Sequence, residues 1–330
     1  MNWMLYASVA VLLFAAERMY LWVATRFNIV DRPNHRSSHT RLTVRGGGVI
    51  FWLAALLAFL VTDLATPYFF AGLTAVALIS FLDDVNSISN RVRLLVQLVG
   101  MALLMGQAGF WPEWWMVFAL IVGCGVLNAY NFMDGINGIT AFYSFVTVTT
   151  LSIINQGFTF FVAPVLPGFV LLSLVVFSFF NARRSALCFA GDVGSVSMAF
   201  IIIFLLGILM RKTGLLTYGL LLTVYGIDSV MTILYRLWRG ENIFQPHKLH
   251  LFQLLVHRLR WPHLRVAGLY AFAQALINVL VIGLAQQNVS TQWIGGAGLV
   301  AVLTLFYWLI KKALLKTESP APVVAPVPPR

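Results

Sequence analysis

The chain has 330 residues, of which 60% are hydrophobic and only 10% are charged, and its formal net charge is +11. Soluble domains use roughly 25% charged residues, so this composition excludes a soluble globular protein and predicts an all-α, polytopic membrane helix bundle. An excess of basic residues in such a protein reflects the orientation of its loops, with attraction to anionic lipid or phosphorylated substrates as a second cause. Without a soluble domain, no nucleic acid is expected as a partner.

Eleven apolar segments can be placed as membrane spans, which take roughly 17 to 25 residues each. Their connections are short, so we predict a single transmembrane domain over residues 1–318, followed by a Pro-rich, disordered tail over residues 319–330. Two cysteines are too few for a disulfide framework, which predicts structural use for both. The predicted spans are 3–24, 46–62, 67–82, 94–111, 114–133, 139–155, 159–180, 193–210, 214–235, 266–285 and 292–310.

The distribution of Lys and Arg predicts the orientation of these spans. If the N-terminus lies outside, alternation places 19 of the 22 Lys and Arg residues in cytoplasmic segments. Because inner loops of membrane proteins carry an excess of these residues, we expect an outer N-terminus and a cytoplasmic C-terminus. The predicted cytoplasmic segments are 25–45, 83–93, 134–138, 181–192, 236–265 and the C-terminal tail.

The first of these loops combines several arginines with His35, His39 and the glycine run 46–48. A loop that only sets topology needs the arginines, but it gains nothing from the histidines and glycines. Guanidinium groups such as that of Arg45 pair with phosphate oxygens, and a glycine backbone can approach an anion closely. We therefore predict that this loop binds phosphate or sugar-phosphate.

Two adjacent acids, Asp83 and Asp84, come at the inner end of the third span and are followed by Arg91 and Arg93. A single charged residue costs about 2.5 to 3.5 kcal/mol at mid-bilayer, so both acids are expected at the interface, facing a cation, a proton or the arginines. Neighbouring residues of a helix point about 100° apart, so only one should reach a shared site. A solvated helix end is the alternative.

The stretch 128–138 carries three amides and one acid at spacings of three, directly after an uncharged apolar run. On a helix such spacing keeps polar groups near one face, and the two glycines that follow let the backbone turn and approach a ligand. The alternative is a polar helix end capped by Asn and Gly. The residues are Asn128, Asn131, Asp134 and Asn137, with Gly135 and Gly138.

Asp192 lies between Gly191 and Gly194, directly before an apolar span. We expect an acid between two glycines to be accessible rather than packed, with a helix N-cap as the alternative. A cap does not explain Phe189 in the same polar loop, where an aromatic face can stack on a base.

His247 and His250, with Lys248 between them, lie in the last large loop and are three residues apart, so they can share a helix face. Their spacing is compatible with zinc, but no cysteine ligand or HExxH motif accompanies them, which favours phosphate binding by imidazole and ammonium groups. The Leu, Phe and Val residues that follow predict a short amphipathic interfacial helix.

Asp83, Asp84, Asp134 and Asp192 all lie at inner ends of spans, on the membrane face that also carries the six histidines. Each motif is ambiguous alone. Their shared placement predicts an active site on the cytoplasmic face for a magnesium-bound, phosphate-rich substrate.

Five ordered blocks over residues 31–257 resemble the polyprenyl-phosphate N-acetylhexosamine-1-phosphate transferase family. They are the Arg/His/Gly loop, FLDD, NAYNFMDGINGI, FAGDVGS and PHKLHL. The resemblance implies a multi-pass protein of the bacterial inner (cytoplasmic) membrane that requires Mg²⁺, accepts Mn²⁺ as a substitute and can form a homodimer. It would transfer N-acetylhexosamine-1-phosphate from a UDP-N-acetylhexosamine to undecaprenyl phosphate and release UMP. GlcNAc is the default sugar, with 6-deoxy sugars such as FucNAc or QuiNAc as alternatives.

The same resemblance implies roles for the acids and amides. Asp83 and Asp84 would be paired acids near the acceptor phosphate, with Asp83 helping to deprotonate or orient it, and Asp134 joins them as a candidate catalytic residue. Asp192 would be a magnesium ligand, with Asn131 as the second.

The remaining implied roles concern the donor substrate. Phe189 would stack on uracil, with Gly135 and Asn137 as further uracil contacts. Groups that would neutralise or position the donor phosphates and sugar are His247, Lys248, His250 and Arg45.

Two departures from the family pattern narrow the choice of substrate. Asn137 stands where several bacterial relatives have a second acid, which suits an amide that reads a uracil edge. The HKLH block differs from the three-histidine run of the peptidoglycan enzyme and resembles enzymes that start O-antigen or other surface polysaccharides. This disfavours a UDP-muramoyl-pentapeptide donor.

The main alternative is a secondary transporter of a phosphorylated or anionic solute. Its ionisable groups should lie near mid-bilayer, often in inverted repeats, and only Asp228 and the pair Glu17 and Arg18 qualify here. A CDP-alcohol phosphotransferase would need a DGxxAR motif, which is missing. A structural scaffold leaves the clustered Asp and His residues unexplained.

Overall fold

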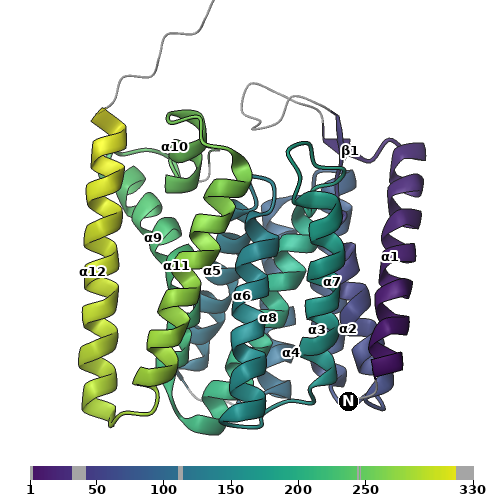
Figure 1. Ribbon diagram of the computed structural model, residues 1–330, viewed down its shortest axis with the longest axis horizontal. Helices are drawn as coiled ribbons and strands as arrows, with labels where there is room; N and C mark the ends of the chain where they lie inside the picture. The colour runs from purple at the N-terminus through teal and green to yellow at the C-terminus, as the bar shows by residue number, and fades with distance from the viewer. Residues whose placement is uncertain (1–2, 32–41, 111–113, 244, 246, 317–330) are drawn as a thin grey trace, which may run out of the picture.

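A computed structural model of the protein describes residues 3–31, 42–110, 114–243, 245 and 247–316. The predicted Pro-rich tail and residues 32–41 of the first loop, with their arginines and histidines, lie outside the described residues. The long helices stand side by side, with β1 (Val30–Asp31) and α10 at one end of the bundle and the N-terminus at the other (Figure 1). The helices are α1 (Trp3–Arg26), α2 (Val49–Val61), α3 (Pro67–Val85), α4 (Asn90–Gln107), α5 (Met116–Met133), α6 (Ile139–Gly157), α7 (Val165–Asn181), α8 (Gly191–Thr213), the 3₁₀ helix η1 (Leu216–Leu222), α9 (Thr223–Trp238), α10 (Leu251–His257), α11 (His263–Leu284) and α12 (Val289–Lys316).

The prediction of an all-α, multi-pass membrane protein is confirmed. Each of the eleven predicted spans overlaps a helix, and the strand pair β1 and β2 (Thr43–Val44) forms only a short antiparallel ladder. Within the described part of the chain, seven helices are long and apolar enough to cross a membrane, and α2 and α7 are shorter apolar helices. The count of eleven spans and the outer N-terminus stay predictions.

The predicted span 159–180 begins late because a side chain holds its first residues outside the helix. The Asn155 side chain accepts hydrogen bonds from the N–H groups of Phe161 and Val162 and donates one to the carbonyl of Val162, at 2.7 to 3.1 Å. Backbone groups in a membrane protein must be bonded internally. Asn155 meets this need, so the connection before α7 can stay irregular.

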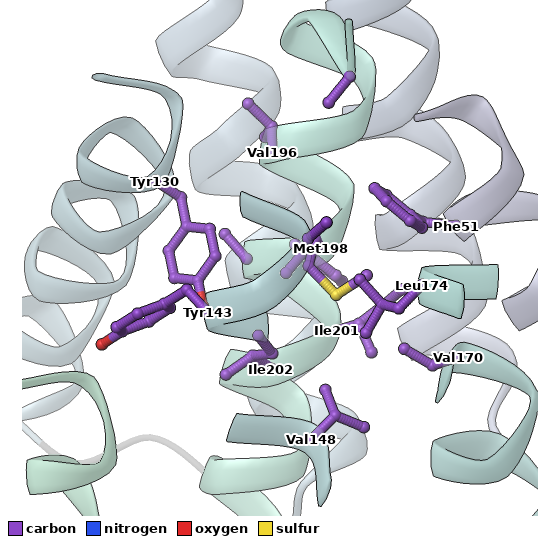
Figure 2. Close-up of a cluster of buried hydrophobic side chains, with 14 of the residues drawn as sticks. Phe51, Tyr130, Tyr143, Val148, Val170, Leu174, Val196, Met198, Ile201 and Ile202 are labelled. Atoms are coloured by element: carbon purple, nitrogen blue, oxygen red, sulfur yellow. The ribbon is translucent and has the colours of Figure 1, made fainter. Parts of the chain in front are cut away.

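Helix α8 is the central element of the bundle. In its most apolar window 78% of the residues are buried inside the protein, whereas the corresponding value for α12 is 11%. Figure 2 shows α8 residues such as Val196, Met198 and Ile202 enclosed by Phe51 of α2 and Tyr130 of α5, together with residues of α6 and α7. Lipid tails are as apolar as these side chains, so close packing rather than exclusion from water stabilises the bundle. The first turn of α8 is thereby held in a fixed place.

Candidate active site

Figure 1 shows β1 and α10 at one end of the bundle, and residues of both elements line a cavity of about 270 Å³. Its wall combines residues from the segments 25–45, 134–138, 181–192 and 236–265, so four of the predicted cytoplasmic segments meet at this end. The predicted site residues that line it are Arg45, Asn131, Asp134, Gly135, Asn137, Phe189 and Asp192. Those outside its lining are Asp83, Asp84, His247, Lys248 and His250.

The glycine run 46–48 packs against the segment that leads into α8. Backbone hydrogen bonds of 2.8 to 3.0 Å join residues 44–48 to Phe189 and Ala190. A β-carbon at Gly194 would lie 2.6 Å from the Cα atom of Gly48, so larger residues would push α2 and α8 apart. We expected this run to let the backbone approach an anion. In the structure, the glycines permit close packing of two backbone segments, and the approach to an anion stays a prediction.

Asp84 caps the N-terminus of α8 from the end of α3. Its carboxylate accepts hydrogen bonds from the backbone N–H groups of Asp192 and Val193, at 2.9 and 3.0 Å, and its side chain is 0% exposed. The first N–H groups of a helix have no partner within the helix, and a negative charge there is favourable. The alternative that Asp192 is the N-cap is therefore wrong, because Asp192 lies in the first turn and Asp84 caps the helix.

Two arginines connect the acids of α3 and α8. The guanidinium of Arg45 lies 2.7 Å from Asp84 and 3.1 Å from Asp192, and that of Arg93 lies 2.5 Å from Asp83 and 3.2 Å from Asp192. The Asp192 side chain is only 14% exposed. The expectation that this acid is accessible rather than packed holds only in part, because Asp192 lines the cavity while both of its oxygens are paired with arginines. The prediction that the adjacent acids face the arginines that follow them is confirmed for Asp83, which pairs with Arg93, whereas Asp84 pairs with Arg45.

The stretch 128–138 divides between the interior of the bundle and the cavity. Helix α5 ends at Met133, so the spacing of three is helical only as far as Asn131. Asn128 donates to the side chain of Gln97 at 3.0 Å and does not line the cavity, which corrects the expectation of one shared face. Asp134 follows the helix end. Its removal from solvent, with the nearby Asp192 carboxylate, raises the pKa of Asp134 to about 6.

The cavity wall next to Asn137 is held by amide side chains. The Asn137 side-chain amide donates to the carbonyl of Arg183 at 2.8 Å, which leaves its carbonyl oxygen as the acceptor. Asn181 accepts from the N–H of Gly138 at 2.7 Å and donates to the carbonyl of Cys188 at 2.8 Å. Gly138 has a φ of +82°, which favours glycine. One amide therefore ties the 134–138 turn to the segment that carries Phe189.

The histidine block lies beside the cavity, not in its lining. Helix α10 begins at Leu251, so His247 and His250 do not share a helix, although their ring centroids are 4.9 Å apart. Burial, together with the facing groups His250, Arg236 and Lys311, lowers the pKa of His247 to about 4. His247 is therefore neutral near pH 7, and of the two predicted roles it can position phosphates but not neutralise them.

Six further residues line the cavity that the sequence did not assign to the site. Most belong to segments predicted as cytoplasmic connections, where a polar residue is ordinary, so composition gives no signal for them. Asn181 is an exception, because it ends the apolar run 159–180 and begins a predicted cytoplasmic segment. The six are Asp31, Ile136, Asn181, Gly191, Gln253 and His263.

Comparison with known proteins shows which proteins the chain resembles. Residues 66–210 match the family model described as glycosyl transferase family 4, and this range includes Asp83, Asp84, the stretch 128–138 and Asp192. The undecaprenyl-phosphate alpha-N-acetylglucosaminyl 1-phosphate transferase of Yersinia pestis is 26% identical over 95% of this chain and 93% of its own length. The protein of the same name from Escherichia coli (strain K12) is 24% identical over 95% and 93%. A probable undecaprenyl-phosphate N-acetylglucosaminyl 1-phosphate transferase of Bacillus subtilis (strain 168) is 25% identical over 71% of each chain.

Proposed function

Because the chain belongs to the polyprenyl-phosphate N-acetylhexosamine-1-phosphate transferase family, we propose that it transfers N-acetylhexosamine-1-phosphate from a UDP-sugar to undecaprenyl phosphate. The products would be UMP and an undecaprenyl-diphosphate-linked sugar. The observation that carries this proposal is a single cavity at one end of a membrane bundle whose wall combines Asp192 and Asn131 with Arg45 and the aromatic Phe189. These groups suit a cation, a diphosphate and a base.

The chemistry is a phosphoryl transfer. An oxygen of the acceptor phosphate attacks the sugar-bearing phosphorus of the donor and forms a new P–O bond. The bond from that phosphorus to the bridging oxygen breaks, and its electron pair leaves with UMP. Several negative charges come together in this step, so cationic groups have to reduce their repulsion. Arg45 places such a group on the cavity wall, where its guanidinium can pair with phosphate oxygens.

A divalent cation forms part of the proposal, and the residues present fit one. Asp192 offers a carboxylate and Asn131 an amide oxygen, since the NH₂ group of Asn131 already donates to Ser195 at 3.2 Å. No cluster of three or more His, Cys, Asp or Glu side chains able to hold a metal occurs in the described ranges. Mg²⁺ commonly uses one or two carboxylates, waters and substrate phosphates, so a sparse donor set suits it. Bound there, Mg²⁺ or Mn²⁺ would neutralise phosphate charge.

The acids divide into positioning and reacting groups in this proposal. Asp84 would act indirectly, because its carboxylate is occupied by the N-terminus of α8 and by Arg45. Asp83, paired with Arg93, would orient or deprotonate the acceptor phosphate. Asp134 lines the cavity itself, and its pKa of about 6 keeps its carboxylate largely ionised near pH 7.

The uridine would lie against Phe189, with the backbone of Gly135 and the free carbonyl oxygen of Asn137 at the uracil edge. His247, Lys248 and His250 would position the donor phosphates and sugar from the loop before α10. The long prenyl tail of the acceptor requires a site at membrane level, which explains why the reaction is built on apolar helices. We place the protein in the bacterial inner membrane, at the start of O-antigen or another surface polysaccharide, with GlcNAc or a 6-deoxy N-acetylhexosamine as the sugar.

The transfer reaction is tested by incubating purified protein with undecaprenyl phosphate, Mg²⁺ and a panel of UDP-N-acetylhexosamines, with and without EDTA. We expect UMP release that requires the acceptor lipid and the metal and is strongest with one sugar. That result would establish the reaction and name the donor together. Folded protein that releases no UMP with any of these donors would contradict the proposal.

A further inference from the structure

Glu17 and Arg18 are neighbours on α1, but their side chains lie on different sides of the helix. Glu17 is 1% exposed and lies inside the bundle, where it accepts a hydrogen bond from the thiol of Cys188 at 3.3 Å. Arg18 is exposed on the outer side of α1, a helix that packs against α7 and α2 at one edge of the bundle (Figure 1). The two residues that suggested a transporter are therefore separated, and the charge of Arg18 faces away from the bundle.

Arg18 belongs to a basic face on the outer side of α1. Arg18, Trp22 and Arg26 recur at a spacing of four, which places them on one side of a helix. Trp22 is 65% exposed, and the guanidinium of Arg26 lies over its ring, 5.9 Å from the centroid. With Leu21 and Thr25 these residues line a hollow of about 410 Å³. We call these five residues the α1 basic face.

The chain supplies no acid to this face within its described ranges. Neither Arg18 nor Arg26 forms an ion pair there, and residues 32–41, which follow soon after α1 in the sequence, contain no Asp or Glu. Arg239 at the end of α9 provides the contrast. Its guanidinium also lies over a tyrosine ring, 5.6 Å from the centroid, but it pairs with Glu241 at 3.0 Å. The charge of the α1 basic face therefore needs a partner from another molecule.

The depth of Arg18 makes a missing partner costly. The 24 residues of α1 span about 36 Å, slightly more than the roughly 30 Å of the hydrocarbon core of a bilayer. Arg18 stands about 12 Å before the helix end at Arg26, so its backbone lies at the depth of the acyl chains. A long side chain can extend toward the interface, but a charge in lipid without a partner is expensive. An anion in the hollow, which both arginines line, removes this cost.

The surface on the other side of Arg18, toward the N-terminus, is apolar on the same face of the helix. Val11 and Met4 precede Arg18 at intervals of seven residues, each close to two helical turns, and they are 70% and 60% exposed. A ligand that fits the whole face has an anionic group at one end and hydrocarbon at the other. This is the chemistry of a phospholipid, whereas free phosphate has no part that would contact the apolar side chains.

We propose that the α1 basic face binds an anionic phospholipid, with the phosphate between Arg18 and Arg26 and an acyl chain along Val11. Guanidinium groups pair with phosphate oxygens, and tryptophan is common at the level of lipid headgroups. The rival occupants are a second copy of this chain and the polyprenyl phosphate acceptor. Binding here does not require the proposed transfer reaction, because none of the five residues of this face lines the cavity.

The test is native mass spectrometry of purified protein titrated with phosphatidylglycerol or with zwitterionic phosphatidylcholine. We expect the first lipid molecule to bind more tightly when it is phosphatidylglycerol. The variant Arg18→Gln/Arg26→Gln should bind it about 25-fold more weakly, because each basic residue near a membrane surface contributes about 5-fold. Arg239→Gln is the matched control and should bind as the wild type does, since this arginine already has an acid as its partner. If the double variant does not fold, Arg26→Gln alone should show a loss of about 5-fold.

Two results in these titrations would overturn the proposal. Equal affinity of the wild type and the double variant for phosphatidylglycerol would mean that the arginines hold no lipid phosphate, and equal affinity of the wild type for the two lipids would mean that the site does not select an anion. The same spectra report the oligomeric state. A double variant that changes from dimer to monomer with unchanged lipid affinity would assign the face to a second copy of the chain.

UMP release separates a resident phospholipid from the acceptor substrate. The double variant should keep the KM for undecaprenyl phosphate within about 2-fold of the wild-type value, because the acceptor reacts at the cavity. A KM raised by about 10-fold or more at unchanged kcat would assign the face to the acceptor and overturn the proposal. If the folded wild type releases no UMP, the proposed reaction fails, while selective binding of phosphatidylglycerol still supports the lipid site.

Discussion

Two helix N-termini beside the cavity are capped in the same way and surrounded differently. In both, a buried carboxylate from another helix accepts backbone N–H groups: Asp84 at the start of α8 and Asp228 at the start of α10. In both, the capping carboxylate also contacts a residue that we predict to be functional, Asp192 in the first case and His250 in the second. A carboxylate is a good cap because it meets unpaired N–H groups and the positive end of the helix dipole together.

The difference lies in what compensates the charge. The charge of Asp84 is paired with the guanidinium group of Arg45, while Arg93 pairs with the neighbouring Asp192, which lines the cavity. Around Asp228 the partners are hydroxyls, with the ammonium group of Lys311 one hydroxyl away. The first arrangement places charged groups at the cavity, whereas the second encloses its charges inside the bundle. Substitutions at Asp84 and at Asp228 should therefore affect activity and stability differently.

The largest effect on UMP release is expected for a substitution of Asp192, whose carboxylate lines the cavity. Asp192→Asn removes the proposed metal carboxylate and the shared partner of Arg45 and Arg93. We expect UMP release to fall by about 10³-fold or more while the protein still folds, because a developing charge loses its compensation. Asp63→Asn is the matched control, since Asp63 is an exposed acid in the loop between α2 and α3. Activity of Asp192→Asn near that of the control would remove Asp192 from the proposed metal site.

The cap itself should show its effect in stability. Asp84→Asn leaves one acceptor for two N–H groups and breaks the ion pair with Arg45, and breaking a buried pair costs about 3 to 5 kcal/mol. We expect a melting temperature lower by several degrees in detergent, together with reduced turnover. Asp83→Asn is the comparison, because Asp83 does not cap α8; it should lower kcat with a smaller loss of stability. Equal melting shifts for the two variants would contradict the capping role of Asp84.

A smaller and more selective effect is expected at Phe189, on the segment that leads into the first cap. Phe189→Ala keeps the backbone hydrogen bonds to residues 44–47 and removes only the ring. Stacking of a base on an aromatic side chain is worth about 1 to 3 kcal/mol, so the donor KM should rise by about 10-fold with a smaller change in kcat. Phe189→Tyr should restore the wild-type KM. A KM unchanged by the alanine would exclude stacking at this position.

The two caps also show which parts of the molecule could be predicted from the sequence. The apolar runs could be predicted because a membrane span must be apolar. The starts of α2 and α7 were predicted too early, because the glycine run 46–48 and the residues bonded to the Asn155 side chain lie outside these helices. Acids and amides of the cavity stood out because polar residues are rare in this chain. They were assigned to a shared site without knowledge of their partners.

The caps could not be predicted, because each joins residues that no local pattern connects. Asp84 bonds to residues 108 and 109 positions later, and Asp228 joins Leu251 to Tyr307 across four helices. Adjacent acids suggested that one of Asp83 and Asp84 would reach a shared site. The sequence contains no sign that one of the pair serves a distant helix end. Spacing also suggested a helix through His247, which a buried cap at Leu251 excludes.

The smallest expected effect is on the pH dependence of stability, and it tests whether His247, beside the second cap, is neutral in the folded protein. The pKa of His247 is about 4 in the folded protein, since burial and the facing groups His250, Arg236 and Lys311 disfavour its charge against the opposing Glu241. In the unfolded chain it is about 6.5. Between these values the unfolded chain binds more protons, so the free energy of unfolding falls as the pH is lowered from about 6.5 to 4.

His247→Gln cannot gain this charge, so it should melt with a shallower pH dependence in that window and nearly the wild-type dependence above pH 7. The measurement is the melting temperature of both proteins in detergent from pH 4 to 8. Identical slopes would mean that His247 is not held neutral, and charge near α10 would then be compensated as it is around Asp84. A difference confined to the acidic window would show that His247 is held neutral in the folded protein, because Asp84 and Asp192 are present in both proteins and contribute equally to each.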